Sequence, residues 1–227
     1  MRRNALQTWA VLGVVATLVL TGCGEDPTTP PGEGQTVDDD ASFVVSLAQV
    51  YASRDPSRFE AMLANLPDAN AVFTFTVTDR TGSTQNVWDV HTEMDIHRRM
   101  FRPNEIPAND PPLDSYLRLD AVTVSLSPLS GFSERADLYR SAANPGGVDA
   151  AIWRVTSARY KTNVFFEPQG NTSFVVDGEA DFVVLENLEK SIGDDGKFLL
   201  LSWSEPCEFV AVQQRECWSA VKSLYAK

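Results

Sequence analysis

The chain has 227 residues, of which 43% are hydrophobic and 22% are charged. This is the composition of a globular protein, and it excludes collagen-like, coiled-coil and wholly disordered chains. The formal net charge of −12 would repel phosphate backbones, so the sequence predicts no nucleic-acid partner.

The N-terminal segment has the pattern of a secretory signal peptide. Arg2 and Arg3 precede an apolar run over residues 5–20, and residues 20–23 read Leu-Thr-Gly-Cys. The last four residues resemble the lipobox of bacterial lipoproteins, which implies a signal peptide over residues 1–22 and acylation of Cys23 by fatty acids such as palmitate. The alternatives are an ordinary secretory signal cut elsewhere and a membrane-spanning helix, although the run is shorter than the roughly 20 apolar residues that span a bilayer.

The acylated cysteine would anchor the protein to a membrane of the cell envelope. Gly24 follows it, where an Asp would resemble an inner-membrane retention signal, so the resemblance implies the outer membrane if the host has one. Residues 24–40 are rich in Pro, Gly and acidic residues and contain almost nothing apolar. Such a segment cannot bury enough surface to offset its ordering entropy, so residues 23–40 are predicted to be a flexible tether and residues 41–227 a single domain.

Helical patterns dominate the first part of this domain. Apolar residues recur at helical spacing over residues 41–53, after acidic residues that suit a helix start. Asp55 and Pro56 can cap and begin a second helix, which we expect Pro67 to end. A third helix is predicted over residues 86–101.

Strand patterns follow. Alternation of side chains predicts a strand over residues 71–78 with a turn at Gly82 and Ser83, and four prolines within residues 103–112 predict a loop. Further strands are predicted over residues 116–126, 151–166, 172–185 and 198–205, and a short C-terminal helix over residues 215–226. Helices followed by long strands indicate an α+β domain with three N-terminal helices packed on one face of a mostly antiparallel sheet.

The two longest predicted strands form a hairpin around the turn residues 168–171. We expect Phe166 opposite Phe174, which gives one apolar face and one face of opposite-charge pairs. The predicted pairs of the second face are Lys161 with Glu179, Arg159 with Asp181, and Asn163 with Asp177. The acids of this face could form a metal or substrate site, but their basic partners favour a solvated surface, and residues 194–196 are predicted to be a hairpin turn instead of a calcium loop.

Several segments together resemble a known family. They are VVSLAQVYASRDPSRFEAMLANLPDANAVFTF, Trp88, a helix ending in HRRMF and a strand ending in LLSWSEP. Over residues 42–206 they look like nuclear transport factor two-like (SnoaL-like) domains of bacterial lipoproteins. The resemblance implies a strongly curved sheet wrapped around three helices into a cystatin-like cone, whose interior holds a ligand, an active site or simply core. Members of this family include enzymes and binding scaffolds, so the fold does not select a function.

Candidate catalytic residues are few. His97 and Tyr51 lie on the apolar stripes of two predicted helices, and with Asp95 or Tyr160 they could supply a general acid and base if the cone is hollow. A core histidine satisfied by a carbonyl or carboxylate is favoured, and Asp95 falls on the opposite side of the helix from His97, so no catalytic residue is assigned.

Metal and cofactor motifs are not indicated by the sequence. His91 and His97 fall on different helix faces, and neither a nucleotide fingerprint nor a nucleophile motif occurs, so we expect no metal and no cofactor. The tryptophans could form an aromatic ligand cage, although core packing is favoured for them. They are Trp88, Trp153, Trp203 and Trp218.

Cys207 and Cys217 remain once Cys23 is acylated. In an oxidising envelope they are predicted to form a disulfide that pins the C-terminal extension.

The first functional hypothesis is a non-catalytic envelope lipoprotein whose cone-shaped domain binds a small apolar ligand or an envelope protein. A second copy of the chain, giving a homodimer, is a further partner considered. The alternative is a SnoaL-like enzyme that performs general acid–base chemistry of the isomerase, dehydratase or cyclase type in the cone cavity. A roomy pocket presenting His97 and a carboxylate would favour the enzyme. A cone filled by Phe59, Met94, Phe101 and Tyr160 would favour binding through the outer surface.

Overall fold

A computed structural model describes residues 39–79, 81, 83–102, 119–168, 173–207, 218–222 and 225. Residues 37–227 belong to one compact unit, and residues 1–36 to another that lies outside the described residues. The predicted signal peptide, Cys23, nearly all of the tether, the proline-rich loop and Cys217 are likewise outside them. No helix among the described residues is long and apolar enough to cross a membrane.

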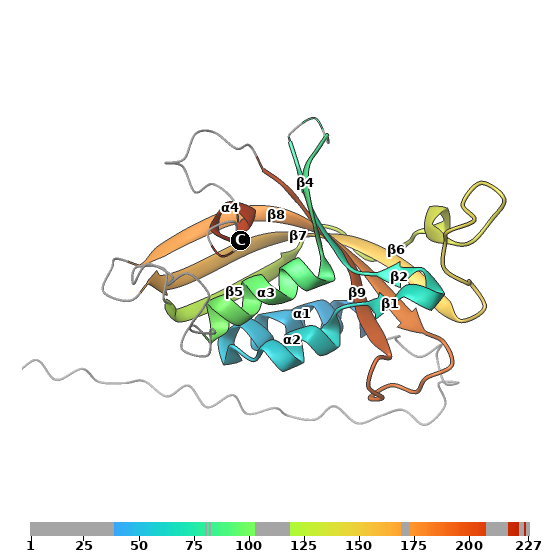
Figure 1. The fold of residues 1–227 in the computed structure, drawn as a ribbon, viewed down its shortest axis with the longest axis horizontal. Coiled ribbons are helices and arrows are strands. Elements are labelled where there is room, and N and C mark those ends of the chain that lie inside the picture. Colours follow the sequence, from blue (N-terminus) through green and yellow to red (C-terminus); the bar gives the residue numbers. More distant parts are fainter. Residues whose placement is uncertain are drawn as a thin grey trace, which may run out of the picture. The chain divides into compact units, whose positions relative to one another are not determined.

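One large mixed sheet dominates the described part of the domain (Figure 1). Its strand order is β4-β3-β9-β8-β7-β5, with β6 paired to β7. The strands are β3 (Thr74–Thr78), β4 (Thr84–Asp89), β5 (Leu119–Pro128), β6 (Ser133–Glu134), β7 (Trp153–Pro168), β8 (Phe174–Asn187) and β9 (Phe198–Pro206). Neighbours are antiparallel except β3 and β9, which run parallel, so the predicted mostly antiparallel sheet is confirmed.

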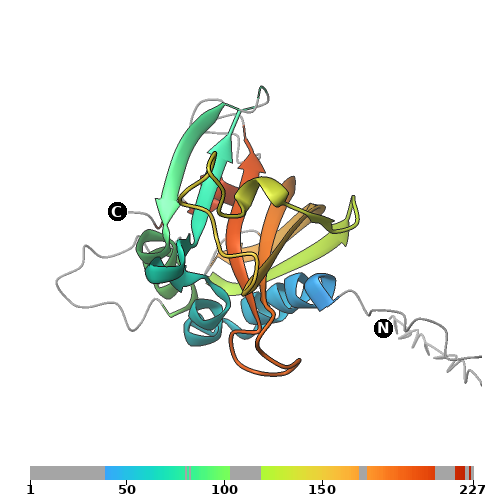
Figure 2. The ribbon, with the colours of Figure 1, turned by 90° about the vertical axis from the view of Figure 1, so that its right-hand side faces the viewer.

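Three helices, α1 (Asp39–Ser53), α2 (Pro56–Met62) and α3 (Val90–Phe101), pack together against one side of this curved sheet (Figures 1 and 2). A short helix, α4 (Trp218–Lys222), follows β9. Two short strands, β1 (Asn65–Leu66) and β2 (Ala71–Val72), pair around the 3₁₀ helix η1 (Pro67–Ala69), and a second 3₁₀ helix, η4 (Ala136–Leu138), follows β6. The α+β class, with three N-terminal helices, a curved sheet and a short C-terminal helix, is therefore confirmed.

Large side chains fill the space between the helices and the sheet. Phe59, Met94, Phe101 and Tyr160, the four side chains expected to fill a closed cone, are each 4% exposed or less. Burial of one such side chain stabilises a fold by about 1.5–3 kcal/mol. The interior in this region is thus packed core.

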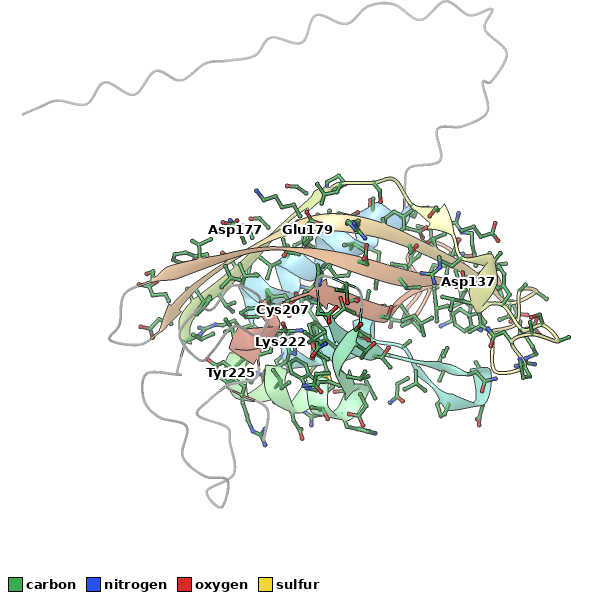
Figure 3. All side chains as sticks on the ribbon, turned by 90° about the horizontal axis from the view of Figure 1, so that it is seen from above. Asp137, Asp177, Glu179, Cys207, Lys222 and Tyr225 are labelled. Atoms are coloured by element: carbon green, nitrogen blue, oxygen red, sulfur yellow. The ribbon has the colours of Figure 1, made fainter. Side chains whose placement is uncertain are left out.

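The hairpin of β7 and β8 has the predicted register. Phe166 lies opposite Phe174, and the pairing continues unbroken to the far end of β8. On the outer face the Arg159 guanidinium donates to both carboxylate oxygens of Asp181, at 2.9 and 3.2 Å. Asn163 Nδ2 donates to Asp177 Oδ1 at 2.7 Å, and Lys161 lies opposite Glu179. Figure 3 shows Asp177 and Glu179 on the outer side of the sheet, and the described residues contain no group of side chains able to hold a metal ion.

The turn predicted at residues 194–196 connects β8 and β9. Lys197 N–H donates to the Asp194 carbonyl at 3.1 Å, and Gly196 adopts a φ of 73°, which a side chain would disfavour.

The second helix is shorter than predicted. It ends at Met62, and the expected continuation to Pro67 is wrong. Ala64 N–H instead donates to the Leu200 carbonyl at 2.9 Å, and the Ala64 carbonyl accepts from Phe73 N–H at 2.7 Å. Extended backbone at this point gains hydrogen bonds to the sheet that a helix would not make.

The third helix starts later than predicted, because residues 84–89 form β4. There Trp88 lies opposite Phe75 of β3, and the two rings stack with centroids 5.0 Å apart. Asp89 then caps α3 by accepting from Thr92 N–H at 2.8 Å. Cross-strand pairing thus outweighs the helical spacing of the first few residues.

Two further boundaries differ. The strand predicted over residues 71–78 is interrupted at Phe73, which separates β2 from β3. The described C-terminal helix covers only Trp218–Lys222 of the predicted range, and Tyr225 N–H donates to the Lys222 carbonyl at 2.9 Å just after it.

Candidate functional site

A cluster of polar side chains lies inside the domain, between the three helices, β9 and α4. Its members, which we call the polar cluster, are each 2% exposed or less. They are Tyr51 of α1, Glu93 and His97 of α3, Glu205 of β9 and Lys222 of α4. Figure 3 shows Lys222 on the opposite side of the sheet from Asp177 and Glu179.

His97 is held by hydrogen bonds at both ring nitrogens. Its Nδ1 lies 2.8 Å from the backbone carbonyl of Glu93, one helical turn earlier. A carbonyl only accepts, so Nδ1 carries the proton and Nε2 accepts from the Tyr51 hydroxyl at 2.6 Å. The Trp218 indole N–H in turn donates to the Tyr51 oxygen at 3.4 Å.

His97 is neutral in this setting. Burial, together with the nearby positive charge of Lys222, lowers the pKa of His97 well below its usual value. Its ring also stacks on Phe59, with centroids 3.7 Å apart, and meets Phe101 edge-on at 5.1 Å. Both ring nitrogens of His97 therefore have hydrogen-bond partners, and aromatic rings enclose it. Its position on the apolar stripe of the predicted helix favoured such a core histidine.

Lys222 and Glu93 form a buried ion pair. Lys222 Nζ donates to Glu93 Oε1, and His97 Nδ1 lies 3.6 Å from the same oxygen. Burial raises the pKa of Glu93 and lowers the pKa of Lys222, while the attraction between the two groups opposes both shifts. Loss of either partner would leave the other as an uncompensated buried charge.

Glu205, on β9, lies near enough to Lys222 for the two charges to influence each other. Its Oε2 accepts from Ser219 N–H at 2.9 Å. Burial raises the pKa of Glu205 to about 7, although the charge of Lys222 and the Ser219 hydrogen bond act in the opposite direction. This carboxyl group therefore gains and loses its proton near neutral pH.

Three buried polar atoms of the site lack a hydrogen-bond partner among the described residues. They are Glu93 Oε2, Glu205 Oε1 and Trp203 Nε1. The Trp203 indole lies near enough to favour the ionised form of Glu205, yet it makes no well-oriented hydrogen bond to it. A buried polar group left unpaired costs about 1–3 kcal/mol, so this arrangement has unused donor and acceptor capacity.

The structure brings together only two of the four candidate acid–base residues, Tyr51 and His97. Asp95 is exposed and lies 3.5 Å from Arg98, so it is not a partner of the buried His97. Tyr160, on β7, packs against the rings of Phe132 and Phe182.

The charged members of the polar cluster were not predicted from the sequence. Glu93 precedes His97 by one helical turn on the apolar stripe, and Glu205 follows Trp203 at the two-residue spacing of inward-facing strand positions. Lys222 follows Trp218 by one helical turn. Each of these charged residues occupies an apolar position of a predicted helix or strand, and that mismatch is the sequence signal that could have identified them as buried.

The tryptophans are core residues that do not form one shared cage. All four are 6% exposed or less, but Trp88 stacks on Phe75 whereas Trp203 and Trp218 contact Tyr51. Cys207 is buried at the end of β9, and the bridge to Cys217 stays a prediction because that residue lies outside the described part of the chain.

Neither a protein-family model nor a curated protein matches this chain. Similar solved structures include the β subunit of benzoate 1,2-dioxygenase from Burkholderia mallei, with 8% identity over 76% of this chain and 90% of that chain and a TM-score of 0.44. Naphthalene 1,2-dioxygenase with indole bound in its active site gives 7% identity, 77% and 80% coverage and a TM-score of 0.45. A domain of unknown function with a cystatin-like fold from Nostoc punctiforme has 10% identity over 78% of this chain and 82% of that chain, with a TM-score of 0.36. Likeness at this level concerns the fold alone.

Proposed function

We propose that this chain is a lipid-anchored protein of the cell envelope whose domain acts by binding another envelope protein through its outer surface, without catalysis. The lipobox-like residues 20–23 and the tether after them support the anchor. The filled interior of the domain is the observation that supports binding without catalysis. An outer-membrane location follows if the host has one.

The interior offers little room for a substrate in the described structure. Tyr51, Phe59 and His97 are fully buried, and the ring of Phe59 covers that of His97. A small apolar ligand is disfavoured as well, because it would have to pack against the charged groups of Glu93 and Lys222 without satisfying them. These contacts favour a partner that binds outside.

The alternative is an enzyme that performs general acid–base chemistry, and one contact favours it. Neutral His97 accepts from the Tyr51 hydroxyl at 2.6 Å, so its Nε2 is already placed as a general base would be to take a proton from a hydroxyl group. Catalysis would require a substrate to displace packed rings before it reached Nε2.

Metabolic labelling tests the anchor. Labelled palmitate should enter the full-length protein in its own host and should be lost from the Cys23→Ala variant. A Cys207→Ala variant is the matched control, and it should keep the label. Unlabelled wild-type protein would refute lipidation.

Photo-crosslinking in the intact envelope tests the binding surface. A photoreactive residue would replace Val175, which is 51% exposed on β8, or its neighbour Val176, which is 3% exposed. Val175 should give an adduct of discrete mass and Val176 none. An adduct of twice the chain mass would identify a second copy as the partner.

Native mass spectrometry of the same wild-type protein separates the two functions. We expect no small molecule at stoichiometric amount. A bound small molecule together with absent adducts would refute the proposal in favour of the enzyme.

A further inference from the structure

Lys222 is fully buried among groups that attract a cation. Its Nζ lies 3.7 Å from the centroid of the Phe75 ring and 4.1 Å from that of Trp203. Aromatic faces attract ammonium groups, most strongly where water is excluded. A buried ammonium without such partners would be very unfavourable, so the surroundings of Nζ have the chemistry of a cation-binding site.

One carboxyl group contacts Nζ directly, and a second acts on it through its charge. Glu93 Oε1 accepts from Nζ, and the charge of Glu205 favours the protonated form of Lys222. The second oxygen of Glu93 and Oε1 of Glu205 have no hydrogen-bond partner among the described residues. An ammonium group carries N–H donors that such acceptors can use.

The walls of this site and its occupant come from different elements of the domain. Phe75 lies on β3, Glu93 on α3, and Trp203 and Glu205 on β9; we call these four residues the ammonium cage. β3 and β9 pair in parallel with Phe75 beside Trp203, so the sheet itself holds both rings. Lys222 enters from α4, a separate segment after β9.

We propose that the ammonium cage is a binding site for a primary alkylammonium group, and that Lys222 is its tethered occupant in this structure. The aromatic faces select a positive charge, and the Glu93 carboxylate selects N–H donors over a fully methylated ammonium group. This inference goes beyond the proposed function. The proposed function requires only that side chains fill the interior, and it does not require a ligand-binding site there.

The test removes the occupant and supplies it as a free molecule. Lys222→Ala, made in the full-length protein in detergent, deletes a propylammonium group beyond Cβ. The probes are n-propylammonium chloride and the neutral 1-propanol, with binding measured by calorimetry and by the shift in Tm. We expect the variant to bind n-propylammonium at least about tenfold more tightly than 1-propanol, which corresponds to about 1.4 kcal/mol.

Two matched proteins sharpen the result. Lys222→Met fills the space without a charge and should bind neither probe. The wild type should bind n-propylammonium more weakly than Lys222→Ala, since the tethered Lys222 competes at high effective concentration. Adding Glu93→Gln to Lys222→Ala should weaken the preference for the ammonium probe, because the aromatic faces remain but the carboxylate that accepts from the ammonium group is lost.

Equal binding of both probes by Lys222→Ala, or binding of neither, would overturn the inference. If that variant does not fold alone, refolding in n-propylammonium but not in 1-propanol supports the inference, and failure in both overturns it. Palmitate labelling and crosslinking report on the proposed function separately.

Discussion

Replacing Glu205 by Gln should change how stability depends on pH. The side chain is fully buried and titrates at about 7 in the folded protein, against an ordinary value of 4.5. Gln keeps the size of the side chain and an oxygen that can accept from Ser219 N–H. The substitution therefore removes the titration and leaves most of the packing.

The sign follows from counting protons. Between pH 4.5 and about 7 the folded protein keeps the proton of Glu205 that the unfolded chain has lost, so this group makes stability fall as pH rises. One pKa unit corresponds to about 1.4 kcal/mol, so the full effect is about 3 kcal/mol, of which about 2 kcal/mol falls between about pH 5 and pH 7. Full burial means that solvent does not screen this contribution.

His97 acts in the opposite direction. Its pKa is lowered well below 6.5 in the folded protein, so below that pH the unfolded chain binds a proton that the folded protein does not. Stability from His97 therefore rises with pH up to about 6.5. In the wild type the two effects oppose each other, whereas in Glu205→Gln the rise due to His97 remains.

Denaturant unfolding at a series of pH values from about 5 to 8 measures this difference. The free energy of unfolding of Glu205→Gln minus that of wild type should increase by about 2 kcal/mol between about pH 5 and pH 7. Glu179→Gln, on the exposed outer face of β8, is the matched control, because it makes the same substitution where solvent reaches the side chain. Parallel curves for wild type and Glu205→Gln would refute the raised pKa and with it the described burial of this carboxyl.

Three other substitutions give direct expectations. Tyr51→Phe removes the donor to His97 and should lower the free energy of unfolding by about 1–3 kcal/mol, measured by denaturant titration; an unchanged value would contradict the buried hydrogen bond. Asp55→Ala removes the N-cap of α2, whose carboxylate accepts from two backbone N–H groups, and should reduce stability by about 0.5–2 kcal/mol, whereas a neutral effect would argue against the cap. Cys207→Ser should reduce stability by about 2–3 kcal/mol only if the bridge to Cys217 forms, so equal Tm values with and without reductant would refute that bridge.

The parts of the fold that could be predicted are those that local pattern determines. The β7–β8 hairpin could be paired residue by residue, since slipping it by one position would mix its apolar and charged faces. The ends of α2 and α3 could not, because they depend on partners far away in sequence. Ala64 is extended through hydrogen bonds with Leu200 and Phe73, and Trp88 through its pairing with Phe75.

The same distinction explains the site. Tyr51 and His97 could be found from the sequence because each interrupts an apolar stripe with a side chain that also packs well in a core. Lys222 could not, since burying an ammonium group is unfavourable until Glu93 and the faces of Phe75 and Trp203 surround it, and these come from three separate elements. These partners lie far from Lys222 in the sequence, so no local pattern around Lys222 reveals them. A charged residue buried at such a cost, with carboxylate oxygens beside it still unpaired, is better explained by a site shaped for cations than by the needs of packing alone. Lys222→Met combined with Glu93→Gln removes both charges of the buried pair and so leaves neither one uncompensated. A gain in the free energy of unfolding of this double variant would mean that the ammonium group is held for recognition and not for the fold.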